Sequence, residues 1–93
     1  MSEYVKIQVE QTDDPDVVAV VTNQALTDDV EEVYNDPDAG EEGSPIAQML
    51  FNGVEGIAAL TITEDTLMIT REPDTPWEDI LDEVRDALRD FFL

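Results

Sequence analysis

The chain contains no cysteine and no histidine among its 93 residues. Cysteine thiolates and histidine imidazoles are the usual ligands of iron–sulfur clusters and transition metals, and they supply the nucleophiles and bases of the common hydrolytic triads. The sequence also lacks a glycine-rich phosphate loop, because Gly53 and Gly56 match neither nucleotide-binding fingerprint. These absences exclude most catalytic centres, and we expect a protein that is not an enzyme and has no catalytic residue.

Basic residues are nearly as scarce, because Lys6, Arg71, Arg85 and Arg89 are the only four. Against them stand 24 acidic residues, which give a formal net charge of -20 at pH 7. Nucleic acids and anionic membranes are bound largely through lysine and arginine, so both would be repelled by this chain. We therefore expect neither nucleic acid nor a membrane as a partner.

Long apolar runs are absent as well. The sequence contains no stretch of about 18 consecutive apolar residues, as a membrane-spanning helix requires, and its amino end lacks the pattern of a secretory signal. These observations predict a cytoplasmic protein. A hydrophobic content of 42% is typical of a small globular chain, so we expect a single domain over residues 1–93.

The acidic residues are spread from Glu3 to Asp90 among valine, isoleucine and leucine, which indicates a solvated outer surface and not a disordered tail. A surface this acidic repels itself in dilute buffer, whereas molar salt screens the repulsion. We interpret the excess of acid as adaptation to a salt-rich cytoplasm, as in a halophile. The alternative is an acidic surface that serves a basic partner, which would concentrate the charge on one element.

Four segments have the pattern of β-strands. Tyr4–Gln11 alternates apolar and polar residues, and Val17–Thr22 is rich in β-branched residues, so the two are expected to pair as a hairpin. A second hairpin is predicted from Ile57–Thr63 and Thr66–Arg71, which are joined at Glu64–Asp65. These two hairpins would form one antiparallel sheet.

Two segments have helical signals. Ser44 is a suitable N-cap and Pro45 a suitable first residue for a helix that continues to Asn52 and ends at Gly53. The last segment, from Trp77 to the carboxyl end, has apolar residues at helical spacing and acids on its outer side. Both helices are amphipathic and would cover one face of the sheet.

The remaining segments are less regular. Ala25–Tyr34 suits a short helix slightly better than an irregular strand, and the composition of Asn35–Gly43 indicates a loop. The order β-β-α-β-β-α predicts an α+β fold, a two-layer sandwich in which an antiparallel four-stranded sheet carries two helices on one face.

Two groups of carboxylates could offer oxygen ligands to Ca²⁺ or Mg²⁺. Asp13, Asp14 and Asp16 share one turn. The second group is Asp36, Asp38, Glu41 and Glu42. Neither group has the spacing of an EF-hand, and such groups arise by chance in an acidic chain. We assign no metal ligand and no cofactor, and keep a carboxylate-based metal-ion binding protein as an alternative function.

A series of short motifs runs through the second half of the chain. In order they are Ser44-Pro45-Ile46-Ala47, Val54-Glu55-Gly56-Ile57, Thr66-Leu67-Met68-Ile69-Thr70-Arg71, Trp77 and Asp90-Phe91-Phe92. In these motifs the chain resembles the amino-terminal domain of Nfu/NifU-type scaffold proteins. Thr12-Asp13-Asp14-Pro15-Asp16 occupies the place of a Thr-Pro-Asn-Pro-Asn turn in that family, keeping the threonine and the second proline. The resemblance also implies that Ala25–Tyr34 is more extended than a helix.

The resemblance implies a freestanding accessory or protein-interaction domain in iron–sulfur cluster assembly. In multidomain relatives this module precedes a separate domain whose Cys-x-x-Cys pair holds the cluster, and a chain without cysteine lacks those ligands. We expect a monomer that binds a protein partner in iron–sulfur biogenesis. The predicted partner-binding residues are Thr12, Asp14, Pro15, Asp16, Ser44, Pro45 and Trp77. An adaptor domain of unrelated role is a further alternative.

Overall fold

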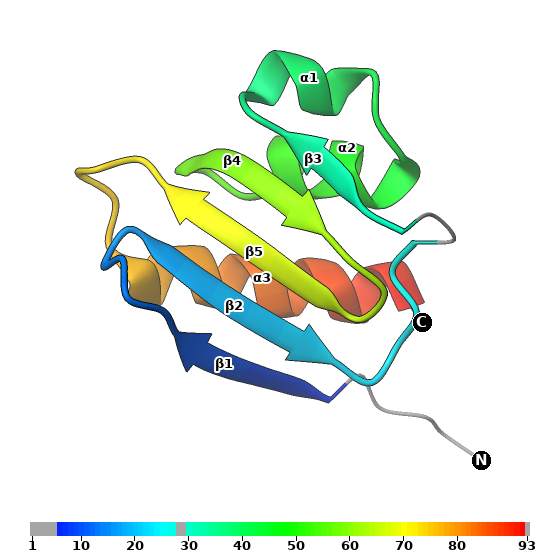
Figure 1. Cartoon of the computed structure of the whole chain (residues 1–93), viewed down its shortest axis with the longest axis horizontal. Coiled ribbons are helices and arrows are strands. Elements are labelled where there is room, and N and C mark those ends of the chain that lie inside the picture. Colours follow the sequence, from blue (N-terminus) through cyan, green and yellow to red (C-terminus); the bar gives the residue numbers. More distant parts are fainter. Residues whose placement is uncertain (1–5, 28–29, 93) are drawn as a thin grey trace.

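The computed structural model describes residues 6–27 and 30–92, which form one antiparallel sheet and three helices (Figure 1). The five strands lie in the order β1-β2-β5-β4-β3, so β1 and β3 are the edges. Along the chain the elements are β1 (Ile7–Gln11), β2 (Val17–Thr22), β3 (Glu32–Tyr34), α1 (Pro37–Glu41), α2 (Pro45–Gly53), β4 (Ile57–Ile62), β5 (Thr66–Arg71) and α3 (Trp77–Phe92).

The central strands β2 and β5 direct alternate side chains to opposite faces of the sheet. Val18 and Val20 of β2 are buried, and they pair with the buried Ile69 and Leu67 of β5. Met68 stands between these two residues and points to the other face. Branched side chains suit this pleated surface, so the sequence of both strands favours an extended backbone with one apolar face.

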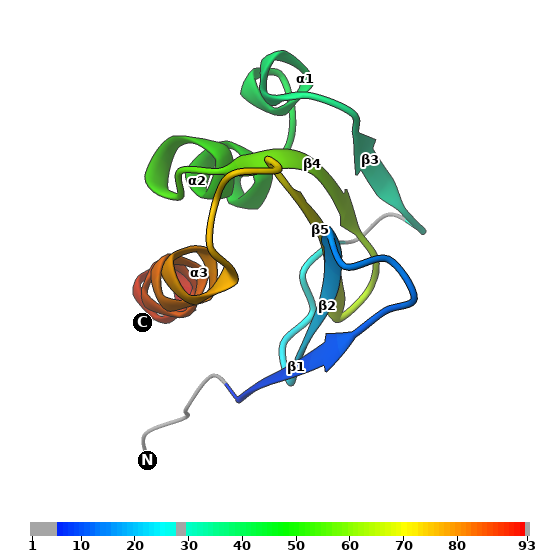
Figure 2. The same ribbon diagram turned by 90° about the vertical axis from the view of Figure 1, so that its left-hand side faces the viewer.

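Helices α2 and α3 cover that apolar face, as the side view shows (Figure 2). Helix α3 buries Ile80, Val84 and Leu88, which recur every four residues along one side of the helix. Helix α2 buries Ile46 and Leu50 in the same cluster. Each such side chain contributes roughly 1.5–3 kcal/mol when it is fully buried, so this layer supplies most of the driving force for folding.

The prediction of an α+β fold with an antiparallel sheet is confirmed, but the sheet has five strands and not four, and the order of elements differs. The helix predicted over Ala25–Tyr34 is wrong in its described part, because Glu32–Tyr34 forms β3. Tyr34 pairs with Leu60 of β4, so this short strand depends on a distant partner that local propensity does not report. Asp28 and Asp29 lie outside the described residues.

The loop predicted over Asn35–Gly43 contains α1 and is therefore also wrong in part. Asp36 accepts a hydrogen bond from the N–H of Ala39 at 2.8 Å, and the next residue is a proline at the start of the helix. An aspartate cap followed by proline is a helix-start signal in its own right. A side chain at Gly40 would overlap the Phe51 ring, so glycine permits the close contact of α1 with α2.

The two predicted hairpins and the two predicted long helices are confirmed. The first strand begins at Ile7 among the described residues, and the predicted start at Tyr4 lies outside them. No helix within residues 6–27 and 30–92 is long and apolar enough to cross a membrane.

Candidate functional site

The turn between β1 and β2 is held by its own hydrogen bonds. The Thr12 hydroxyl oxygen lies 2.8 Å from the carbonyl oxygen of Val17 and accepts from the N–H of Asp14 at 3.2 Å. The Asp14 carboxylate accepts from the N–H of Asp16 at 2.9 Å. Threonine and aspartate close turns in this way because their short side chains reach the backbone two residues on. Pro15 is thereby held in an exposed position.

Trp77, the first residue of α3, lies against this turn. Its indole N–H donates to the carbonyl oxygen of Pro15 at 2.9 Å, across 62 positions of the sequence. The side chain is only partly buried and packs against the margin of the core. A tryptophan with its ring on an apolar layer and its N–H bound at the surface is suited to a contact with another molecule.

Arg71, the last residue of β5, connects the turn to the start of α3. Its Nε lies 3.0 Å from Oδ1 of Asp16, its Nη1 donates to the carbonyl oxygen of Thr75 at 3.2 Å, and its guanidinium carbon lies 5.5 Å from the centre of the Trp77 ring. The Asp16 side chain is 45% exposed, so this ion pair is worth about 0–1 kcal/mol. The stacking on tryptophan adds roughly 0.5–1 kcal/mol. Arg71 therefore adds little stability, and its main effect is to position the β1–β2 turn relative to Trp77.

The chain that leads into Trp77 passes close to Gly56. The carbonyl oxygen of Gly56 accepts from the N–H of Glu72 at 2.7 Å, and a side chain at Gly56 would overlap Thr75. Gly56 also has a φ of 96°, a conformation that glycine adopts far more readily than other residues. The turn before β4 thus fixes the segment that carries Trp77.

A pocket of about 280 Å³ lies between the β1–β2 turn and Trp77. Its lining residues are Gln11, Thr12, Asp14, Pro15, Val17, Val18, Arg71 and Trp77. Four predicted partner-binding residues therefore meet here, and a fifth, Asp16, adjoins them through its ion pair with Arg71. Small-molecule sites commonly enclose about 300–1,000 Å³, so this pocket is suited to a single side chain of a partner.

The other two predicted residues, Ser44 and Pro45, do not line this pocket. The N–H of Ser44 donates to the Tyr34 hydroxyl at 3.2 Å, and the Ser44 hydroxyl accepts from the N–H of Ala47 at 3.4 Å. Pro45 follows as the first residue of α2. Both residues thus have a structural role, in which they join β3 to the start of α2.

Glu32 is part of the same joint. Burial raises the pKa of its carboxyl, but hydrogen bonds from the side chains of Thr27, Tyr34 and Ser44 outweigh that effect and hold the pKa below its ordinary value of 4.5. The Tyr34 hydroxyl donates to the Glu32 carboxylate directly. This carboxylate is therefore ionised at neutral pH and ties β3 to the start of α2.

Within the described ranges, no group of three or more acidic side chains is placed to hold a metal ion. Two carboxylates from the acidic segments instead accept backbone hydrogen bonds, Asp14 from Asp16 and Asp36 from Ala39. These bonds explain, without a metal ion, why aspartates occur at those positions. Asp14 closes a turn, and Asp36 caps a helix.

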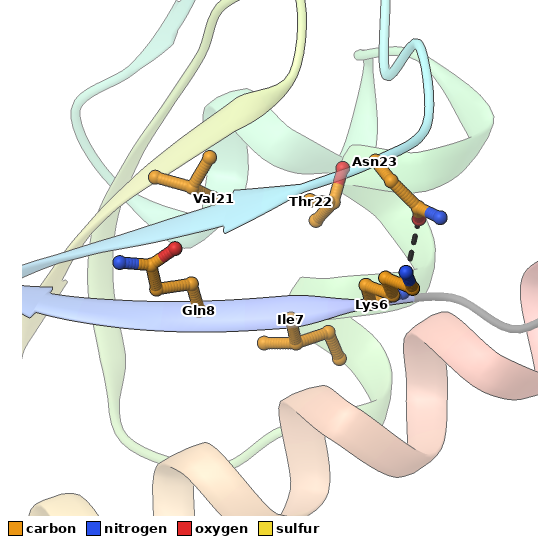
Figure 3. Close-up of a pocket in the computed structure, with 6 residues that line it drawn as sticks. All are labelled: Lys6, Ile7, Gln8, Val21, Thr22 and Asn23. Atoms are coloured by element: carbon orange, nitrogen blue, oxygen red, sulfur yellow. Dashed lines mark hydrogen bonds between the residues drawn. The ribbon is translucent and has the colours of Figure 1, made fainter.

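A second hollow, of about 460 Å³, lies where β1 begins (Figure 3). The backbone N–H of Lys6 donates to Oδ1 of Asn23 at 2.9 Å across its mouth. Figure 3 shows Ile7 pointing toward α3, whereas Gln8 and Val21 point to the opposite side of the sheet. The hollow contains none of the predicted site residues, and its lining carries no pair of groups with a chemical role.

Sequence reasoning missed Arg71 as a site residue. The sequence does contain one indication of its importance, because a chain with 24 acidic and only four basic residues has an arginine at few positions. The contacts with Asp16 and Trp77 give the reason for this one. Spacing along the chain gave no indication of them, since Arg71 and Asp16 are 55 positions apart.

Comparison with protein families gives one match, over residues 7–93, to the family described as scaffold protein Nfu/NifU N terminal. The matched region includes every strand and helix described above. A comparison with curated proteins gives no match.

Solved structures share the fold. A NifU-like protein from Saccharomyces cerevisiae has a TM-score of 0.77 and 21% sequence identity, with 94% of this chain and 77% of that chain covered. Protein SAV1430 from Staphylococcus aureus has a TM-score of 0.73 and 16% identity, with 92% and 99% covered. Protein SeR13 from Staphylococcus epidermidis has a TM-score of 0.60 and 17% identity, with 92% and 98% covered. At these identities the likeness establishes the fold alone.

Proposed function

The chain belongs to the Nfu/NifU N-terminal domain family, which is associated with iron–sulfur cluster scaffold proteins, and on this premise we propose that it is a non-enzymatic interaction domain of cluster assembly. It binds a protein partner through the β1–β2 turn together with Arg71 and Trp77. The observation that carries the proposal is the meeting of these three parts around one pocket in a member of this family.

The pocket favours a protein side chain with an apolar stem and a positive end. The Trp77 ring and Pro15 offer apolar surface, while Asp14 is exposed at the lining. Lysine and arginine side chains bury their stems on apolar surface and keep the charge at a carboxylate, so Asp14 would meet the charge, while Arg71 already stacks on the Trp77 ring. A basic anchor residue on the partner would therefore be held by these groups.

The chain acts beside the cluster and does not hold it. Cluster irons are ligated by thiolates or, in some centres, imidazoles, and neither group occurs in the 93 residues. The donor set therefore does not fit a cluster, and no step of assembly is assigned to a metal bound by this chain.

Affinity capture from the native cytosol in molar KCl, with the immobilised chain as bait, tests the proposal. We expect enrichment of an identified cluster-assembly protein or of an enzyme that receives clusters. The purified captured protein is then titrated with the wild type and with Arg71→Gln, and we expect affinity about 10-fold weaker for the variant because it loses the group that aligns the turn with Trp77.

Arg85→Gln is the matched control, since it removes the same charge from an exposed position of α3. It should bind like the wild type. A captured set without any cluster-assembly protein contradicts the assignment to that process. Equal losses for Arg71→Gln and Arg85→Gln contradict the assignment of the site.

A further inference from the structure

The face of the sheet opposite the helices carries no charged residue on its four contiguous strands β2, β5, β4 and β3. We call this surface the open face, and its outward residues are Val17, Ala19, Val21, Val33, Ala59, Thr61, Thr66, Met68 and Thr70. Strand register places them side by side, with Ala19 and Thr61 both opposite Met68 and Val33 opposite Thr61. Six of the nine are apolar and three are threonines.

No helix lies over this surface. Figure 1 looks onto the open face, and β2, β5 and β4 are seen in front of α3. The side view shows α2 and α3 together on the opposite side of the sheet (Figure 2). Val33 is 51% exposed, and the other outward residues are partly exposed.

The absence of charge sets the open face apart from α1, α3 and the turns, although α2 also has no charged residue. Charged residues are 30% of the sequence, which would place two or three of them among nine surface positions. Strands disfavour aspartate and glutamate in general. That preference is an incomplete reason, since edge strand β1 of the same sheet presents Glu10 beside Ala19.

We propose that the open face is where a second copy of this chain docks in concentrated salt. A basic partner would be drawn to the acidic surfaces of α1, α3 and the turns, and it gains nothing from a face without charge. An acidic partner is repelled by those surfaces and can approach closely only where charge is absent. The chain itself, at a net charge of -20 and with a matching uncharged face, is such a partner.

The geometry of the face suits a pair of identical sheets. Two sheets pack face to face at about 10 Å with their strands rotated by roughly 30°. In a two-fold dimer the same patch meets itself, so Met68, at the middle of the row, would contact the row of the other copy. Four strands about 4.8 Å apart and about 20 Å long give roughly 300–400 Å² on each copy, well below a standard interface, so association is weak.

Salt decides whether the pair forms. The Debye length is about 10 Å at 0.1 M ionic strength and about 3 Å at 1 M, so two such acidic bodies repel each other strongly only in dilute buffer. The monomer expected from the sequence is then the state in dilute buffer, and the dimer is the state in molar KCl. Dimer formation can be distinguished from partner binding at the Trp77 site, because the two surfaces share only Val17, where they adjoin.

Sedimentation equilibrium of the purified wild type tests the proposal, at concentrations from about 10 µM to 1 mM in roughly 0.1 M and 2 M KCl. We expect 10.4 kDa at low salt and, in 2 M KCl, a shift toward twice that mass at the higher concentrations, because an interface of this size is weak. A mass of one chain at every salt and concentration overturns the proposal.

Two variants place a charge on the open face, Met68→Glu and Thr61→Glu, and each should weaken the dimer at least 10-fold. Phe91→Glu is the matched control, because Phe91 is an apolar side chain that is 41% exposed on α3, away from the open face. It should leave the dimer unchanged. Circular dichroism confirms that each variant is folded, and the second variant serves if the first is not. Loss of the dimer in Phe91→Glu with retention in both others assigns the contact to α3 and overturns the proposal.

Discussion

The outer side of α3 and the open face are both turned away from the core, yet they differ completely in charge. The exposed residues of α3 are Glu78, Asp79, Asp82, Glu83, Arg85, Asp86, Arg89, Asp90 and Phe91. All but the last are charged, whereas none of the nine residues of the open face is. The excess of acid is thus not spread over every element, and the surface has two parts with different physical roles.

This difference refines the interpretation of the charge. Adaptation to salt alone would place acid on every solvated surface, and a single acidic docking site would confine it to one element. The chain does neither, because helices α1 and α3, the turns and Glu10 of edge strand β1 carry acid, while α2 and the outward positions of the central strands carry no charge. The acid is best understood as the solvated part of the surface, and the bare strands as the part reserved for contact.

The largest expected difference in stability is between substitutions of two neighbouring residues of β5 that point to opposite faces of the sheet. Ile69 is fully buried and Met68 points to the open face. We expect Ile69→Ala to lower the free energy of unfolding by about 3 kcal/mol, because it leaves a cavity in the core. Met68→Ala should lower it by less than about 1 kcal/mol in dilute, monomeric protein. Urea denaturation at low protein concentration measures both, and equal losses would contradict a solvent-facing position for Met68.

The charged part of the surface should make stability depend on salt. We expect the free energy of unfolding to rise by roughly 2 kcal/mol between about 0.1 M and 1 M KCl, because salt screens the repulsion among the acidic residues. Thermal melts at low protein concentration, where no dimer forms, give the dependence. Stability that does not rise with KCl would contradict the interpretation of the acid as adaptation to salt.

Removing an acidic residue from α3 and, in a second variant, adding one to the open face tests the difference between the two surfaces. Asp82→Asn on α3 should stabilise the monomer by about 0.5 kcal/mol at low salt, and Thr61→Asp on the open face should destabilise it by about 1 kcal/mol, since acids repel one another and aspartate disfavours strands. In molar KCl the effect of Asp82→Asn should vanish. A stabilising Thr61→Asp would show that the open face is ordinary solvated surface.

The smallest expected effect lies at Glu32, where one acid has a structural role. Its pKa is held below the ordinary carboxyl value, so the stability it adds is present above about pH 4.5 and is lost as the pH falls through the lowered pKa. Glu32→Gln should therefore be less stable than the wild type near neutral pH, and the difference should disappear in acid. Glu31→Gln, an exposed neighbour, is the control. Parallel pH profiles for wild type and Glu32→Gln would exclude the effect.

Most of the secondary structure could be predicted from regular sequence patterns, and the elements that were not predicted have physical reasons. The hairpins and the helices after Ser44 and Trp77 were predictable because each has local periodicity or a cap. Strand β3 was not, because three residues are held extended only by pairing with β4. Helix α1 was not predicted because the acidic, glycine-containing composition of its segment is typical of a loop, although Asp36 and Pro37 begin a helix.

The candidate site was predictable in parts but not as an arrangement. The β1–β2 turn and Trp77 were each found from family motifs, yet their contact joins residues 62 positions apart. Arg71 holds them together and was missed. Ser44, by contrast, has a helix-capping role that its sequence also explains. The open face could be derived from outward strand positions only once the register was known.

The most direct test of the two-part surface is a dilution series followed by amide NMR in molar KCl. Chemical-shift changes with protein concentration should appear at outward residues of the central strands, with Ala19, Thr61 and Met68 among the largest, and the exposed charged residues of α3 should not shift. Shifts centred on α3, or a spectrum that is the same at every concentration, would contradict the assignment of the uncharged face to contact and of the acidic surface to solvent.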